Sequence, residues 1–212
     1  LGHSFPTRRS SDLGNRVVVV YHNHLIAYFL VLIKSIGGKF MLHELLGGNK
    51  IKIEECGISF EEMYDKPYFP KEYEEEIKKS NFLMIPEEGF RGYEEVLFPE
   101  ETLKFYNYVK EHAKEDIYPE ICISDEDYKE LELHADVLNI VQFIVCSIAL
   151  PFAINMITSY LDDKRKSRKE DLDVKVKINV EVKDGFKKIT YEGSAKNFKS
   201  SMETVSKTLI GD

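Results

Sequence analysis

Residues 172–182 read LDVKVKINVEV, which is the clearest pattern in this chain of 212 residues. Apolar side chains occupy every second position from Leu172 to Val182, with polar or charged side chains between them. Because side chains of a strand point alternately to the two faces of a sheet, this alternation predicts a strand with one buried face. Asp184-Gly185 then predicts a hairpin turn, and residues 186–191 the returning strand.

A helix is expected directly after this hairpin, beginning near Gly193-Ser194. Its apolar stripe has steps of four, three and four residues, which is the spacing of one helix face: Phe198, Met202, Val205 and Leu209. Residues 172–212 are therefore predicted to form a ββα tail. A hairpin with one helix is marginally stable alone, so we expect its apolar face to pack on a partner surface.

Charge separates this tail from the residues before it. Residues 42–136 contain 11 Lys or Arg and 26 Asp or Glu, a net charge of −15, whereas residues 137–161 contain no charged residue. Residues 162–212 contain 13 Lys or Arg and 10 Asp or Glu, a net charge of +3. We therefore predict an acidic head over 41–136, an apolar connector over 137–161 and a basic linker over 162–171 before the tail.

The acidic head has the pattern of a small α/β unit. Residues 51–54 alternate as a strand does, residues 71–79 form a short charged helix, and the apolar run at 82–85 indicates a buried strand. Pro99 is placed at the first position of a helix that reaches about residue 112, and residues 117–124 form a third strand. Ser124 is expected to cap another helix. The prediction is a three-stranded parallel βαβαβ head, and an α+β fold for the whole chain.

The apolar connector is predicted to be one long helix, kinked at Pro151. Its 25 residues are enough to span about 30 Å of hydrocarbon. The basic residues that follow are typical of the cytoplasmic side of a membrane and of contact with lipid headgroups: Lys164, Arg165, Lys166, Arg168 and Lys169. One interpretation is a transmembrane helix with a cytoplasmic tail. The other is a long core helix in a soluble, cytoplasmic oligomer.

The first forty residues are expected to be non-native translation. Residues 3–13, HSFPTRRSSDL, can be back-translated into the end of a widely used short-read sequencing adapter. Residues 37–41 can be written GGA GGT AAA TTT ATG, which is a bacterial ribosome-binding sequence before a start codon. We therefore expect the protein to begin at Met41.

Composition and motifs exclude several functions. A net charge of −8 and a pI near 5.4 argue against nucleic acid as a partner. Three cysteines without a CxxC pair make no disulfide framework and indicate a reducing compartment. The histidines and cysteines share no metal-ligand spacing, and the sequence has no phosphate-binding glycine loop and no nucleophile elbow. No metal and no cofactor is predicted from these motifs.

If the head has a ligand site, it is expected where its parallel strands end. The loops that follow residues 82–85 and 121–124 offer these side chains: Glu87, Glu88, Arg91, Tyr93, Asp125 and Asp127. Their carboxylates could hold a divalent cation, and Arg91 could pair with a phosphate or carboxylate of the ligand. The alternative is that these are solvated charges, with Asp125 and Asp127 serving a helix start.

The order of patterns in residues 137–209 resembles the tails of effector-associated components of bacterial conflict and antiphage systems. It comprises an apolar helix, a basic stretch, a hairpin with Asp184-Gly185 and a closing helix. The resemblance implies a membrane-associated bacterial interaction or effector subunit, which forms a homo-oligomer or binds a partner protein. The other hypothesis is a small α/β enzyme or ligand-binding protein that acts on a polar small molecule.

Overall fold

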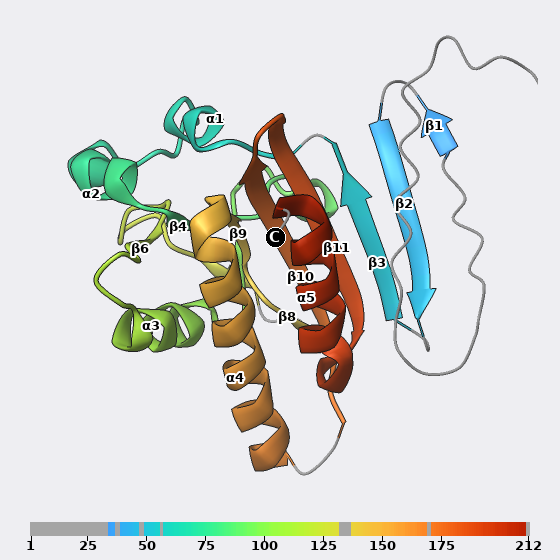
Figure 1. The fold of residues 1–212 in the computed structure, drawn as a ribbon. Coiled ribbons are helices and arrows are strands. Elements are labelled where there is room, and N and C mark those ends of the chain that lie inside the picture. Colours follow the sequence, from blue (N-terminus) through green and yellow to red (C-terminus); the bar gives the residue numbers. More distant parts are fainter. Residues whose placement is uncertain are drawn as a thin grey trace, which may run out of the picture.

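A computed structural model describes residues 34–36, 39–46, 49–55, 57–131, 137–168 and 171–210. Nine strands of these residues form one sheet in the order β1-β2-β3-β11-β10-β9-β4-β6, and β8 also pairs with β10. Figure 1 shows this sheet running from β6 on one side to β1 on the other. The strands are β1 (Lys34–Ile36), β2 (Lys39–Leu46), β3 (Asn49–Glu54), β4 (Phe82–Ile85), β6 (Pro119–Ile121), β8 (Val137–Asn139), β9 (Gln142–Val145), β10 (Asp173–Val182) and β11 (Gly185–Ser194).

Helices cover both faces of the central strands. One face carries α3 (Thr102–His112), α4 (Leu150–Arg168) and α5 (Ala195–Ile210), whose buried side chains share one core. The other carries α1 (Phe60–Tyr64) and α2 (Glu74–Lys79) over a smaller core. Three short 3₁₀ helices connect these elements: η1 (Lys71–Tyr73), η2 (Phe90–Gly92) and η3 (Ser147–Ala149). A separate pair of short strands joins β5 (Phe98–Pro99) to β7 (Glu130–Leu131).

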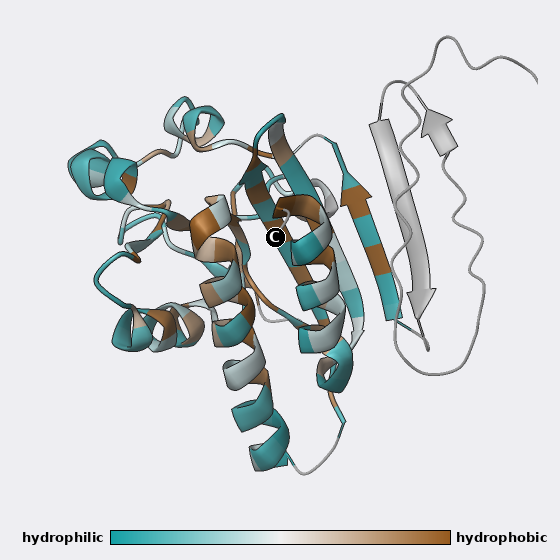
Figure 2. Cartoon of the chain, in the orientation of Figure 1, coloured by the Kyte–Doolittle hydropathy of each residue, from teal (hydrophilic) through white to brown (hydrophobic). Residues whose placement is uncertain are grey.

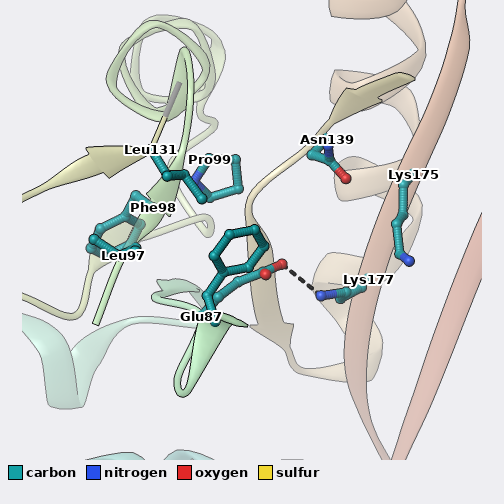
Figure 3. A pocket seen from close by; sticks show the side chains of 9 residues that line it. Glu87, Leu97, Phe98, Pro99, Leu131, Asn139, Lys175 and Lys177 are labelled. Carbon is teal, nitrogen blue, oxygen red and sulfur yellow. Dashed lines mark hydrogen bonds and ion pairs between the residues drawn. The ribbon is translucent and has the colours of Figure 1, made fainter. Parts of the chain in front are cut away.

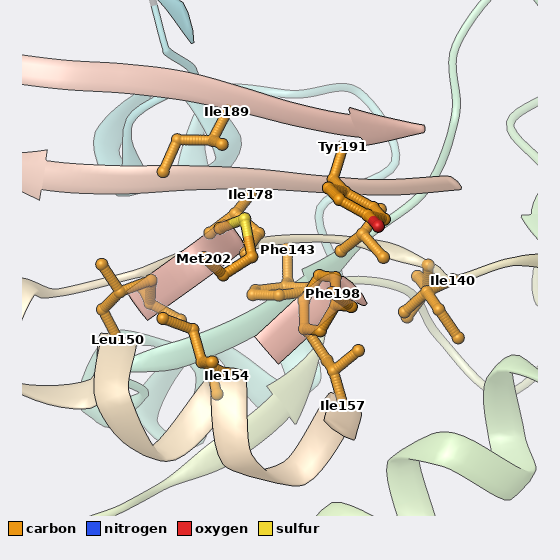
Figure 4. Packing of buried hydrophobic residues seen from close by; sticks show 14 of the residues in the cluster. Ile140, Phe143, Leu150, Ile154, Ile157, Ile178, Ile189, Tyr191, Phe198 and Met202 are labelled. Atoms are coloured by element: carbon orange, nitrogen blue, oxygen red, sulfur yellow. The ribbon is translucent and has the colours of Figure 1, made fainter. Parts of the chain in front are cut away.

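The β10–β11 hairpin and α5 have the predicted arrangement. The strands pair antiparallel from Asp173↔Ser194 to Val182↔Gly185, and Gly185 has a φ of 118°, which a residue without Cβ adopts readily. Three residues of the predicted α5 stripe are buried, and Leu209 is partly buried beside them. Figure 4 shows α4 and α5 side chains meeting those of the strands. The partner surface of the tail is thus α4 and the sheet of its own chain.

The prediction of one long apolar helix over 137–161 is wrong. These residues form β8, β9, η3 and the first part of α4, and α4 continues into charged turns that end at Arg168, as Figure 2 shows. Among the helices of the described residues, none is long and apolar enough to cross a membrane. This finding overturns the transmembrane helix and the membrane association inferred from it.

Burial on both faces explains the error. The side chains of Gln142 to Val145 are all buried, and a strand buried on both faces has the same continuous apolar pattern as a core helix. Pro151 does not kink a helix, because it lies in the first turn of α4, where its missing N–H is not needed. The helix connects β9 to the parallel strand β10, which makes a βαβ unit.

The acidic head does not form its own parallel sheet. Of the three predicted strands, β4 and β6 pair in parallel, but β3 lies apart from them and pairs antiparallel with β2 and β11. The other neighbour of β4 is β9. Strands of the head and of the later residues therefore share one sheet, which no local pattern could indicate because β3–β11 and β4–β9 pair residues far apart in the sequence.

Two predicted helix starts also differ from the structure. Pro99 ends β5, and α3 begins three residues later at Thr102. The Ser124 Oγ accepts a hydrogen bond from the Asp127 N–H over 3.1 Å, but residues 125–127 form a turn rather than a helix. The adapter match at residues 3–13 lies outside the described residues.

Candidate functional site

The sheet face opposite α4 and α5 is polar over β10, β11 and β3. Because these strands alternate, each buried apolar residue on the helical side leaves a charged or polar neighbour on the other side. Five lysines gather there: Lys50, Lys52, Lys175, Lys177 and Lys188. Three carboxylates accompany them: Glu54, Glu192 and Glu87, the last from the segment after β4. Asp173 and Glu181, exposed near the two ends of β10, lie on the same face, so the five lysines are balanced by five carboxylates overall, with the lysines gathered at the middle of the face.

A cavity of about 110 Å³ opens between β10 and the segment that follows β4. Its polar side is made by Lys175, Lys177 and Asn139. Its apolar side carries these residues: Phe90, Leu97, Phe98, Pro99 and Leu131. Figure 3 shows the two sides facing one another, with Glu87 between them. The volume is small beside the roughly 300–1,000 Å³ of pockets for drug-sized ligands, so it suits a ligand of few atoms.

The segment after β4 is folded back on itself. Glu87 and Leu97 exchange two backbone hydrogen bonds of 2.8 and 3.1 Å, and Gly89 adopts a φ of 63° in the turn between them. The Phe98 N–H then donates to the Lys129 carbonyl over 2.9 Å, which starts the β5–β7 pair. These backbone bonds fix the apolar side of the cavity and place Glu87 opposite β10.

Glu87 and Lys177 form the ion pair at the centre of this site. The Lys177 Nζ donates to Glu87 Oε1 over 2.5 Å, and the two side chains are 22% and 24% exposed. Lys175, two residues earlier on β10, pairs with Glu192 of β11 over 2.5 Å. Both lysines of the cavity thus hold a carboxylate of the protein itself.

Lys188 differs from the other lysines of this face. It is half-buried on β11, beside Glu54 and Asn179 in the register of the sheet. Burial lowers the pKa of its ammonium below the ordinary value of 10.5, and the positive charge of Lys177 lowers this pKa further. Within the described ranges the Lys188 ammonium makes no hydrogen bond or ion pair, because Glu54 pairs with Lys52 instead, over 3.0 Å.

Of the predicted site residues whose side chains the structure describes, only Glu87 lines the cavity. Glu88 accepts hydrogen bonds from Lys66 Nζ and Tyr68 Oη over 3.0 and 2.6 Å. Burial raises the pKa of the Glu88 carboxyl, but these two hydrogen bonds outweigh it and hold this pKa below its ordinary value. Tyr93 is 60% exposed, and Arg91 belongs to η2 with its side chain outside the described part.

The other two predicted carboxylates have partners of their own. The Tyr73 hydroxyl lies 3.5 Å from Asp125 Oδ2, and Ser124 Oγ donates to Asp127 Oδ2 over 2.9 Å. In the part of the chain that the structure describes, no group of three or more His, Cys, Asp or Glu side chains is placed to hold a metal ion. The divalent-cation hypothesis therefore gains no support from the arrangement of these carboxylates.

The basic cluster at the end of α4 is largely paired within the protein. Lys164 contacts Glu101, and its Nζ lies 5.2 Å from the centre of the Tyr160 ring. Arg165 pairs with Asp162 and Asp171 over 3.2 and 3.3 Å. Lys166 pairs with Asp163 over 3.2 Å, Arg168 is exposed at the end of the helix, and Lys169 lies outside the described residues.

Sequence reasoning missed most of the cavity. The alternation over 172–182 predicts only that Lys175 and Lys177 lie on the polar face of a strand. Asn139 falls within the predicted apolar helix. Their juxtaposition depends on the pairing of β8 and β10 and on the folded segment after β4. The usable signal was the pair of lysines at every second position of β10, because such side chains share one face.

Comparison with known proteins gives no match: no family, no curated protein and no solved structure is similar to this chain. The resemblance of residues 137–209 to effector-associated tails stays a prediction.

Proposed function

We propose that this protein binds a small organic anion in the cavity beside β10. The observation that carries the proposal is the division of the cavity into a polar side with Lys175, Lys177 and Asn139 and an apolar side around Phe98. A charged group of the ligand would meet the lysines, and its short carbon chain would meet the apolar side. The sequence led to the hypothesis of a ligand-binding protein for a polar small molecule, and this proposal specifies the class of that ligand.

The chemistry of the two sides selects the ligand class. Ammonium groups bind carboxylates and phosphates through charge-assisted hydrogen bonds, which are about twice as strong as neutral ones. The Asn139 amide can donate a further hydrogen bond. The cavity of about 110 Å³ limits the ligand to a few carbon atoms, as in a short-chain carboxylate or a phosphate monoester. For so few atoms we expect a Kd between about 0.1 and 10 mM.

Glu87 acts in this proposal as an internal competitor. It holds Lys177 while the cavity is empty of ligand, so the lysine is paired in both states. Binding then exchanges one anion for another at Lys177, which avoids the desolvation of an unpaired ammonium. Glu87 lies at a turn of the chain and its side chain is partly exposed, so it can rotate into solvent.

The test is calorimetric titration of the full chain with matched compounds. Butyrate and ethyl phosphate carry a short carbon chain with a negative charge, and butyramide carries the same chain without charge. We expect the anions to bind and butyramide not to bind. Lys177→Met should weaken the binding of both anions at least about tenfold. Lys166, which is exposed near the end of α4, is the control, and Lys166→Met should leave anion binding unchanged. Equal binding of butyramide, or an unaffected Lys177→Met variant, would overturn the proposal.

The interaction or effector subunit inferred from the sequence, and the homo-oligomer or partner protein that goes with it, stay predictions.

A further inference from the structure

Three lysines of the polar sheet face surround Thr190. Lys52 and Lys177 are its register partners on β3 and β10, and Lys188 lies two residues before it on β11. All three side chains are on the same face as Thr190, because Ile189 and Tyr191 point into the core on the other side. We name Lys52, Lys177 and Lys188 the lysine triad.

The charge of this triad is only partly balanced. Lys52 pairs with Glu54 over 3.0 Å and Lys177 with Glu87 over 2.5 Å, while Lys188 has no ion pair or hydrogen bond among the described residues. Burial and two like charges disfavour this ammonium, and the attraction of Glu54 and Glu87 offsets them only in part, so the pKa of Lys188 stays below its ordinary value. Nothing in the packing requires a lysine there, since its register partner Asn179 is held by Ile58 and Phe143 instead. The arrangement is unfavourable without an anion and favourable with one.

We propose that the lysine triad binds a phosphate group, so that the ligand of the cavity is a small organic phosphate. This inference rests on the proposed function and specifies its ligand class. Charge selects the dianion: when the ligand displaces Glu87, three lysines and Glu54 leave a charge of +2, which matches a phosphate dianion. A carboxylate would neutralise only half of it.

Lys177 relates the phosphate site to the cavity. Lys177 belongs to the triad and also lines the cavity. A phosphate on the triad therefore places the carbon chain of its ester toward Phe98 and Leu97 on the apolar side. Lys188 lies outside the cavity lining, so it contributes to the phosphate and not to a carboxylate bound at Lys175 and Lys177.

The test compares ethyl phosphate with butyrate on the full chain. We expect Lys188→Met to weaken the binding of ethyl phosphate about tenfold and the binding of butyrate by less than about twofold. Lys188→Arg keeps the charge and should retain most of the affinity for ethyl phosphate. Lys187→Met is the matched control, because Lys187 is the half-buried neighbour that pairs with Glu55 on the opposite side of the strand. Thermal unfolding of each variant shows that it is folded.

The pH dependence gives a second readout. A phosphate monoester loses its second proton near pH 6, so ethyl phosphate should bind several-fold more tightly at pH 7.5 than at pH 5, whereas butyrate, whose carboxyl group is mostly ionised already at pH 5, should change by less than about twofold. Equal effects of Lys188→Met on both compounds would overturn the phosphate inference and leave the anion site intact. Absence of binding by both compounds would overturn the inference together with the proposed function.

Discussion

Lys177 Nζ lies 2.5 Å from Glu87 Oε1, although the two residues are 90 positions apart in the sequence. This ion pair joins the segment after β4 to the middle of β10 and lies at the centre of the cavity. Both side chains are about three-quarters buried, so the pair is shielded from salt more than a surface pair would be. If Glu87 competes with the ligand, removing its charge should improve binding.

Glu87→Gln should therefore tighten the binding of ethyl phosphate about three- to tenfold. The glutamine keeps the size of the side chain but cannot hold Lys177 by charge. Because the pair is about three-quarters buried, loss of the Glu87 charge should lower the free energy of unfolding in urea by about 1–3 kcal/mol, which leaves the variant folded for the titration. Calorimetry of the variant beside the parent checks the direction. Weaker binding would show that Glu87 supports the ligand instead of competing with it.

A pair of lysine substitutions tests the assignment of residues 137–161. Ile154 of α4 is 2% exposed in the core between the sheet and α5, whereas Ile148 of η3 is 79% exposed. Ile154→Lys should lower the free energy of unfolding by more than about 3 kcal/mol, because it buries an unpaired charge. Ile148→Lys should change it by less than about 0.5 kcal/mol. Urea denaturation measures both, and similar losses in the two variants would contradict this packing.

Asn49 at the start of β3 holds the end of β11. Its Oδ1 accepts from the Ser194 N–H over 3.0 Å and lies 3.2 Å from the Tyr191 hydroxyl. A Cβ on Gly193 would lie 2.2 Å from the same atom, so only glycine fits beside it. Asn49→Ala should cost about 1–3 kcal/mol of stability, since it leaves a part-buried N–H without its acceptor. Exposed Asn107→Ala is the control, and an equal effect of the two would refute the role of Asn49.

Glu101 should govern part of the acid sensitivity of the fold. Burial raises the pKa of its carboxyl, but hydrogen bonds from Lys164, Tyr160 and Lys104 outweigh this and hold the pKa below its ordinary value of 4.5. The stability from this group is complete above about pH 4.5 and is lost as the pH falls through the lowered pKa of the folded state. Glu101→Gln should flatten the acid limb of stability against pH, measured by urea denaturation from pH 3 to 7. An unchanged limb would contradict this assignment.

The elements that could be predicted from the sequence are those that bury one face, because burial of one face gives a regular spacing of apolar residues. The alternation of β10, the Asp184-Gly185 turn and the stripe of Phe198, Met202 and Val205 are of this kind, and all are present. The uniformly buried run at 82–85 was also identified as a strand, because Asn81 and Pro86 limit its length. The similar run at 142–145 merged with α4 into one apolar segment, and its length then favoured a helix.

The site was less predictable than the fold. Glu87 could be named because it follows a buried strand, but its partner Lys177 depends on β9 lying between β4 and β10. A strand order of this kind is determined by long-range burial and not by any short pattern. The lysine triad likewise requires the register of three strands, of which only the hairpin could be read from the sequence.

Leucine methyl NMR on the full chain tests the central claim most directly, because it locates the ligand without any substitution. Leu97 and Leu131 line the cavity, whereas Leu161 of α4 is fully buried in the core and Leu103 is exposed on α3. On titration with ethyl phosphate, we predict progressive, saturable shifts of the Leu97 and Leu131 methyl signals, with those of Leu103 and Leu161 unmoved. Saturating shifts at Leu103 or Leu161 with none at Leu97 and Leu131, or no shifts at all, would contradict an anion-binding site beside β10.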